Sequence, residues 1–136
     1  MLFAATLLLL LFLIRGCDYW FWGEGDIDRT LTTFRQHRPS FDSFVTWAEQ
    51  KTTRTCIQKS SVKSCLPKSI DPVLVQSLPF VSYDPLIVEV APVNFYYVLV
   101  YTEDIRHVKQ SSAYQDEGII LQQVESRWTL VRRGWM

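Results

Sequence analysis

The sequence has no excess of charge of either sign. It contains 14 Lys and Arg against 14 Asp and Glu, so its formal net charge is zero. Nucleic-acid binding is disfavoured because no stripe of basic residues could follow a phosphate backbone. No block of about five or more like charges marks a disordered tail.

Residues that most often carry catalysis are also scarce. The only two histidines, His37 and His107, lie among Arg, Gln and Lys in segments typical of a solvated surface. A general acid or base needs an orienting carboxylate and a cleft, and the sequence indicates neither. There is no G-x-S-x-G motif, and no cysteine has a supporting histidine. We therefore expect no enzymatic activity, cofactor or metal. The alternative is a hydrolase or transferase without a sequence motif, which a cleft holding either histidine beside a carboxylate would favour.

Cysteine is limited to three residues. Cys56 and Cys65 lie nine positions apart in a polar stretch, and in an exported chain this arrangement predicts a disulfide bond. Closing so short a loop constrains the unfolded chain by roughly 2–3 kcal/mol on the entropy model. A zinc site is the alternative, but no second pair of Cys or His accompanies these two.

Basic residues are missing from the start of the chain, where an apolar run extends over Leu2–Ile14. As a helix this run is roughly 20 Å long, which is short of the roughly 30 Å hydrocarbon core of a bilayer. Its length matches the apolar part of a secretory signal. Arg15 follows the run, and this single charge favours the cytoplasmic side for what comes after it.

The residues after the run resemble a bacterial lipobox, in which a small residue precedes a lipid-bearing cysteine. Gly16 and Cys17 match that pattern, whereas Arg15 replaces the small uncharged residue expected there. Cys17 is therefore a candidate for lipidation. The resemblance implies that Asp18 would then keep the protein in the inner membrane.

An uncleaved membrane anchor is the other main interpretation of this segment. Residues 19–22, Tyr-Trp-Phe-Trp, have the amphipathic rings that prefer the headgroup region. We expect residues 1–22 to be a signal or anchor segment, 23–25 a flexible joint, and 26–136 a single globular domain. Ordinary cleavage and a buried helix in a soluble protein remain alternatives.

A helix is predicted to begin the domain. Asp26 is suited to the N-cap and Asp28 to the first turn. Capping also explains why Glu24, Asp26 and Asp28 alternate, because the closing glutamate of a calcium loop is absent. Pro39 predicts two collinear helical pieces. Apolar residues recur at helical spacing on one face: Ile27, Leu31, Phe34, Phe41, Phe44, Val45 and Ala48.

The rest of the chain predicts an antiparallel sheet. Residues 51–69 are polar and are expected to be a loop or hairpin, and residues 73–78 a short element. Period-two alternation begins near residue 81, residues 94–102 suit a central strand, and residues 118–125 and 128–133 suit a hairpin. We expect an α+β fold, with the N-terminal helix packed on a four-stranded, mainly antiparallel meander.

These features together resemble a type of small exported bacterial protein to which no function is assigned. The resemblance spans most of residues 26–135 and implies no activity. It rests on Phe34, His37, Leu78, Pro79, Gly118, Ile119, Trp128 and Trp135.

One candidate recognition surface remains, where tryptophan and arginine occur together near the C-terminus. Trp128, Arg132, Arg133 and Trp135 have the composition of a protein-contact hot spot. The alternative is that the rings line the sheet core. We expect a membrane-anchored protein of the bacterial inner membrane, with a periplasmic, non-catalytic domain that binds another envelope protein in an accessory or immunity-type role. A secreted protein, a domain on the cytoplasmic face and a small subunit of a membrane complex are the alternatives.

Overall fold

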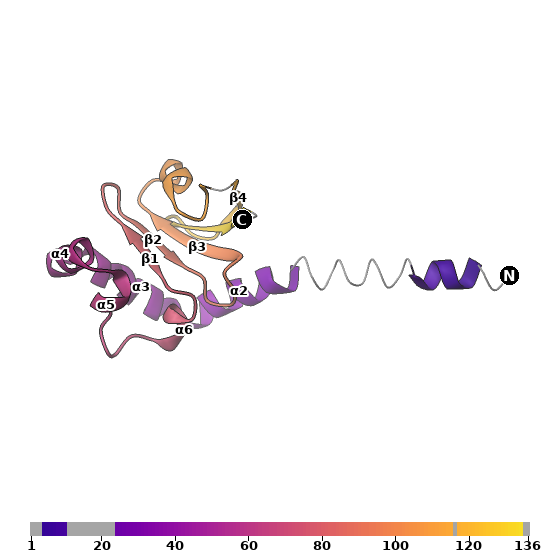
Figure 1. Ribbon diagram of the computed structural model, residues 1–136, viewed down its shortest axis with the longest axis horizontal. Coiled ribbons are helices and arrows are strands. Elements are labelled where there is room, and N and C mark those ends of the chain that lie inside the picture. Colours follow the sequence, from indigo (N-terminus) through magenta and orange to yellow (C-terminus); the bar gives the residue numbers. More distant parts are fainter. Residues whose placement is uncertain (1–3, 11–23, 116, 135–136) are drawn as a thin grey trace.

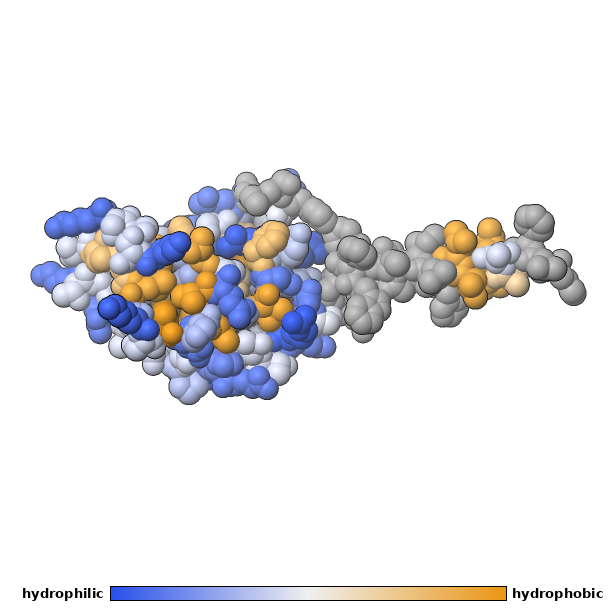
Figure 2. All heavy atoms as spheres, turned by 60° about the horizontal axis from the view of Figure 1, so that its bottom comes forward, coloured by the Kyte–Doolittle hydropathy of each residue, from blue (hydrophilic) through white to orange (hydrophobic). Residues whose placement is uncertain are grey.

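The computed structural model describes residues 4–10, 24–115 and 117–134. Residues 4–10 are helical, and Leu7–Leu10 are 57–67% exposed. Figure 2 shows most of this helix in orange, the colour of hydrophobic residues. None of the helices in the described ranges is long and apolar enough to cross a bilayer. The expectations for Cys17 and for residues 19–22 lie outside the described residues.

The main domain has an α+β fold, as expected (Figure 1). Its helices precede most of its strands along the chain. The helices are α2 (Glu24–Gln36), α3 (Arg38–Glu49), α4 (Lys51–Lys59), α5 (Val62–Cys65), α6 (Pro72–Val75) and the 3-10 helix η1 (Ile105–Gln110). The strands are β1 (Phe80–Ser82), β2 (Ile87–Val90), β3 (Tyr97–Thr102), β4 (Ile119–Gln123) and β5 (Trp128–Arg132).

The sheet has five strands in the order β1-β2-β3-β5-β4, and every neighbouring pair is antiparallel. Two details of the prediction are therefore wrong: the strands number five, and β5 lies between β3 and β4. The difference arises after β3, where η1 and the following turns carry the chain past the position of β5. The β4–β5 hairpin then returns its second strand to β3.

The two predicted helical pieces are confirmed as α2 and α3. The chain turns at His37, and Pro39 lies in the first turn of α3, where a missing backbone N–H costs no helical hydrogen bond. Most of the predicted apolar face is buried: Leu31, Phe34, Phe41, Phe44, Val45 and Ala48 are each at most 7% exposed. Asp26 is not the N-cap, because α2 begins two residues earlier at Glu24.

Apolar side chains cover both faces of the sheet. On one face, residues of α2, α3 and α6 pack against Val88, Leu99 and Leu130. On the other, Val108 and Ala113 from η1 and the turn after it pack against Val98 and Val131. All six residues of β3 are consequently buried, which confirms it as a central strand.

The expectation for residues 51–69 is wrong, because this stretch forms α4 and α5 rather than a loop or β-hairpin. Ile57, Val62 and Leu66 are its partly buried contributions to the apolar core, and Thr53 is also buried. So few apolar residues give no readable helical period. A disulfide bond joins Cys56 in α4 to Cys65 in α5, with an S–S distance of 2.03 Å.

A tight turn precedes β4. Glu117 adopts a positive φ of 63°, and Gly118 follows it. A Cβ atom at Gly118 would lie 2.5 Å from the carbonyl oxygen of Ala113 and 2.6 Å from Cα of Tyr114. Only glycine allows this close approach of two backbone segments, which sets where β4 begins.

Candidate functional site

Trp128, the first residue of the predicted recognition surface, lies in the core. It is 1% exposed, and its ring packs edge-on against Phe34, Phe41 and Tyr101 at centroid distances of 5.3–5.5 Å. For this residue the structure matches the alternative in which the ring lines the sheet. Trp128 therefore connects the helix layer to the sheet and presents no surface to a partner.

Arg132 and Arg133 lie at the end of β5 and are partly exposed. The backbone N–H of Arg133 donates to the carbonyl of Tyr96 at 2.8 Å, and its Nη2 lies 4.0 Å from Oε2 of Glu89. Glu89 is 1% exposed and also accepts hydrogen bonds from the Ser112 hydroxyl and the Ala113 N–H. Arg133 therefore compensates a buried charge, whereas Arg132 makes no comparable contact among the described residues. Trp135 lies outside the described residues.

The most exposed apolar strand of the domain is β4. All five of its residues are exposed, and Ile119, Ile120 and Leu121 are 36–46% exposed. It pairs with β5 on one side and forms an edge of the sheet on the other. A register shift between Ile120 and Gln122 places Leu121 at a bulge. We call Ile119, Ile120 and Leu121 the β4 edge.

The exposure of the β4 edge could not be predicted, because its residues have the pattern of an ordinary strand. An apolar run such as Ile119–Leu121 is typical of a strand covered by neighbours. Here η1 and the helices cover the sheet as far as β5, whose residues Trp128, Leu130 and Val131 are buried, whereas no residue of β4 belongs to either buried cluster. Its exposure depends on strand order, which no local pattern encodes.

A second exposed feature is the aromatic pair Phe95 and Tyr96 in the β2–β3 loop. The two rings are 47% and 48% exposed, and their centroids lie 4.1 Å apart. Asn94 supports them, because its Oδ1 accepts the N–H groups of Tyr96 at 3.0 Å and Tyr97 at 3.3 Å. The position of the pair in the loop, and not a sequence motif, singles it out.

His37 lies beside a carboxylate, which the sequence did not indicate. Its Nδ1 is 3.0 Å from Oδ2 of Asp71, and the Ser40 hydroxyl donates to the same oxygen at 2.8 Å. The other oxygen, Oδ1, accepts the N–H of Val73 at 3.1 Å and so caps α6. These hydrogen bonds, first that of Val73 and then those of Ser40 and His37, hold the pKa of Asp71 below its ordinary value.

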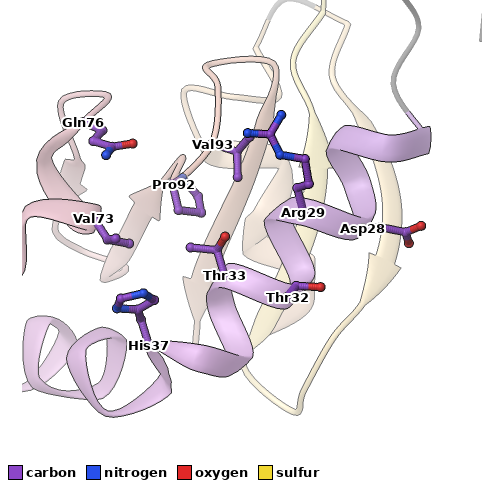
Figure 3. A pocket seen from close by; sticks show the side chains of 9 residues that line it. All are labelled: Asp28, Arg29, Thr32, Thr33, His37, Val73, Gln76, Pro92 and Val93. Carbon is purple, nitrogen blue, oxygen red and sulfur yellow. The ribbon is translucent and has the colours of Figure 1, made fainter. Parts of the chain in front are cut away.

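His37 also lines an open hollow of about 440 Å³ between α2 and the segments around α6 and the β2–β3 loop (Figure 3). The other lining residues shown there are Asp28, Arg29, Thr32, Thr33, Val73, Gln76, Pro92 and Val93. A second hollow of about 400 Å³ lies beside Ser40 and Asp71 and reaches Trp47 and Ile70.

His37 and Asp71 form the histidine–carboxylate pair of an acid–base site, but the hydrogen bonds of Asp71 also hold the fold together. Asp71 accepts three hydrogen bonds, and Ser40 donates to Asp71 rather than facing the histidine. In the described part of the chain, no hydroxyl donates to the imidazole of His37. The arrangement holds the α2–α3 junction against α6. Among the described residues Nε2 of His37 accepts or donates no hydrogen bond, so it is the ring nitrogen left for proton transfer.

His107 is half-buried in η1, and its Nδ1 is buried without a hydrogen-bond partner among the described residues.

The first turn of α2 holds Asp26, which bonds to Arg29 at 3.3 Å and to Asn94 at 3.0 Å. In residues 4–10, 24–115 and 117–134, no group of three or more Cys, His, Asp or Glu side chains could hold a metal ion. Asp26 therefore bonds within the fold in this structure.

No protein-family model, curated protein or solved structure matches this chain.

Proposed function

We propose that this chain is a membrane-tethered, non-catalytic binding protein of the bacterial envelope. The tether is the apolar segment within residues 1–22, and the domain faces the periplasm from the inner membrane. The apolar run Leu2–Ile14 supports the tether, and the Cys56–Cys65 bridge suits an oxidising compartment. The partner is another envelope protein.

The observation that carries the proposal is the β4 edge. Edge strands present unpaired N–H and C=O groups, and soluble domains usually protect them with charge or proline. Ile119–Gln123 contains neither charge nor proline. Three large apolar side chains on such a strand are typical of a contact surface.

An extended segment of the partner fits this edge best. Added as a sixth strand, it would satisfy the outer backbone groups of β4 and cover its side chains, the mode known as β-augmentation. Ile120 pairs with Val131 and Ile119 with Arg132, so apolar side chains lie on both faces of the sheet at this edge. The bulge at Leu121 restricts which segments fit, because it bends the strand locally.

A photo-crosslinking residue at Leu121 of the full chain tests this contact in cells. We expect one discrete crosslinked product whose other component is identified by mass spectrometry. The same residue at Gln58, exposed on α4, is the matched control and should give no such product. In an Ile120→Lys background the Leu121 product should be lost, because an edge lysine opposes strand addition. A product that persists with Ile120→Lys, or equal yields at both positions, would contradict the proposal.

An enzyme is the second candidate, favoured by the contact between His37 and Asp71 at the hollow. Ligand-observed NMR with a metabolite panel separates the two functions. An enzyme predicts a compound that binds the full chain and not His37→Gln. Binding that is unaffected by His37→Gln, or absent, supports a structural role for this histidine.

A further inference from the structure

We infer that the β2–β3 loop is a second membrane contact, with Phe95 and Tyr96 lying in the headgroup region of the bilayer. This inference rests on the proposed membrane tether. The partner is a lipid surface, and the contact is distinct from the β4 edge that binds protein. We call the end of the sheet where β2 stops at Val90 and β3 begins at Tyr97 the leader end.

The leader end lies next to the point where the N-terminal segment joins the domain. Asn94 Nδ2 donates to Oδ2 of Asp26 in the first turn of α2 at 3.0 Å. Figure 1 shows α2 beginning at this side of the domain. In the sequence, residues 19–22 end two positions before Glu24, where α2 begins. A headgroup position for residues 19–22 therefore brings the Asn94 loop close to the bilayer.

Exposed apolar residues gather at the leader end. Phe95 and Tyr96 are 47% and 48% exposed, and Leu78 is 66% exposed. Leu78 belongs to the same end, because the hydroxyl of the preceding Ser77 donates to the carbonyl of Ala91.

The opposite end of the sheet has a different character. Its loops and the start of η1 carry the charged residues Asp84, Glu103, Arg106, Glu125 and Arg127, and the exposed apolar residue there is Ile105. The asymmetry fits a domain with one end against lipid and the other in water.

The chemistry at the leader end suits the headgroup region rather than the hydrocarbon core. Tyr96 combines an apolar ring with a hydroxyl, which is the property that places tyrosine at membrane interfaces. The backbone of Arg133 bonds to Tyr96, and Arg29 is 71% exposed nearby. Asp28 lies in the same turn as Arg29, so the local charge is mixed. The rings, and not a net positive charge, therefore provide the contact.

Depth measurement on the full chain tests the inference. A nitroxide is attached at Phe95→Cys, in a Cys17→Ser background, and the protein is reconstituted into vesicles of phosphatidylethanolamine and phosphatidylglycerol. The matched control carries the nitroxide at Ile105→Cys, because Ile105 is 41% exposed and lies past the opposite end of β3. Collision rates with oxygen and with a water-soluble nickel complex are read by electron paramagnetic resonance, and co-sedimentation is measured on the same samples.

We expect both chains to sediment with vesicles, and a nickel collision rate several-fold lower at position 95 than at position 105. Sedimentation with equal nickel access at the two positions would overturn this inference and leave the tether intact. Failure of both chains to sediment would overturn the tether and this inference together.

Discussion

Arg38 and Glu125 join the helix layer to the β4–β5 hairpin. Nη2 of Arg38 lies 2.6 Å from Oε2 of Glu125, and Nε lies 3.1 Å from Oε1, across 87 positions of sequence. The Arg38 guanidinium also lies 5.1 Å from the centroid of the Phe34 ring and bonds to Asp42. The hairpin that carries the β4 edge is thus held by a charged contact at its turn.

The first prediction concerns this ion pair. Its hydrogen bond holds the pKa of Glu125 below the ordinary value of 4.5. The stabilisation is therefore present above about pH 4.5 and is lost as pH falls through the lower folded-state value. Glu125→Gln should lower the free energy of unfolding by at most about 1 kcal/mol, because the pair is partly exposed. In this variant, hydrogen exchange of the backbone amides of β4 and β5 should be faster than in the original protein. Unchanged exchange in those amides would show that the pair does not hold the hairpin.

The second prediction concerns Asp71, which caps α6 and binds His37 and Ser40. Asp71→Asn should lower the free energy of unfolding by about 1–2 kcal/mol, measured by chemical denaturation. The folded-state pKa of Asp71 is lowered from 3.8, so its contribution is lost as pH falls below that value. The variant should therefore lose less stability on acidification than the original protein. Glu49→Gln, at an exposed position of α3, serves as the control and should change neither property.

The third prediction separates core from surface among the aromatic residues. Trp128→Ala should destabilise the domain by about 3–5 kcal/mol, because the cavity removes contacts with three rings. Tyr96→Ala should change stability by no more than about 0.5 kcal/mol, because its ring is exposed. Thermal unfolding of the two variants measures the contrast. Similar losses for both would mean that Trp128 does not connect the two layers.

The fourth prediction concerns the two arginines at the end of β5. Arg133→Ala should cost about 1–3 kcal/mol, because it removes a charge that faces the buried Glu89 carboxylate. Arg132→Ala should cost no more than about 0.5 kcal/mol. Combining Arg133→Ala with Glu89→Gln should restore part of the loss, since the two sites are coupled. Strictly additive effects in this double-mutant cycle would argue against the contact.

Much of the fold follows from local patterns in the sequence. The apolar face of α2 and α3 is visible as a helical period, their break as Pro39, and the buried strand β3 as a run that is apolar on both faces. Residues 51–69 have too few apolar side chains to show a period, and α4 and α5 form there against the core, where a disulfide bond joins them. Strand order escaped prediction because the position of β5 depends on long-range pairing.

The candidate sites were predictable only in part. The arginines and tryptophans near the C-terminus predict a recognition surface. In the structure Trp128 is buried in the core, whereas Arg132 is partly exposed. Histidine and carboxylate meet at His37 and Asp71 although 34 positions separate them. No spacing rule predicts such a meeting. Phe95 and Tyr96 lie exposed in the β2–β3 loop, which the Asn94 side chain stabilises by accepting two backbone N–H groups.

Maleimide-polyethylene glycol labelling of fractionated cells tests the membrane tether and the oxidising compartment together. Cells expressing the full chain are quenched with acid, membranes are washed with carbonate, and free thiols are labelled before and after reduction. We expect the chain to stay in the washed membranes, and Cys56 and Cys65 to be labelled only after reduction. Recovery in the cytosolic fraction with all three thiols labelled before reduction would contradict the tether, the oxidising compartment and the envelope function together.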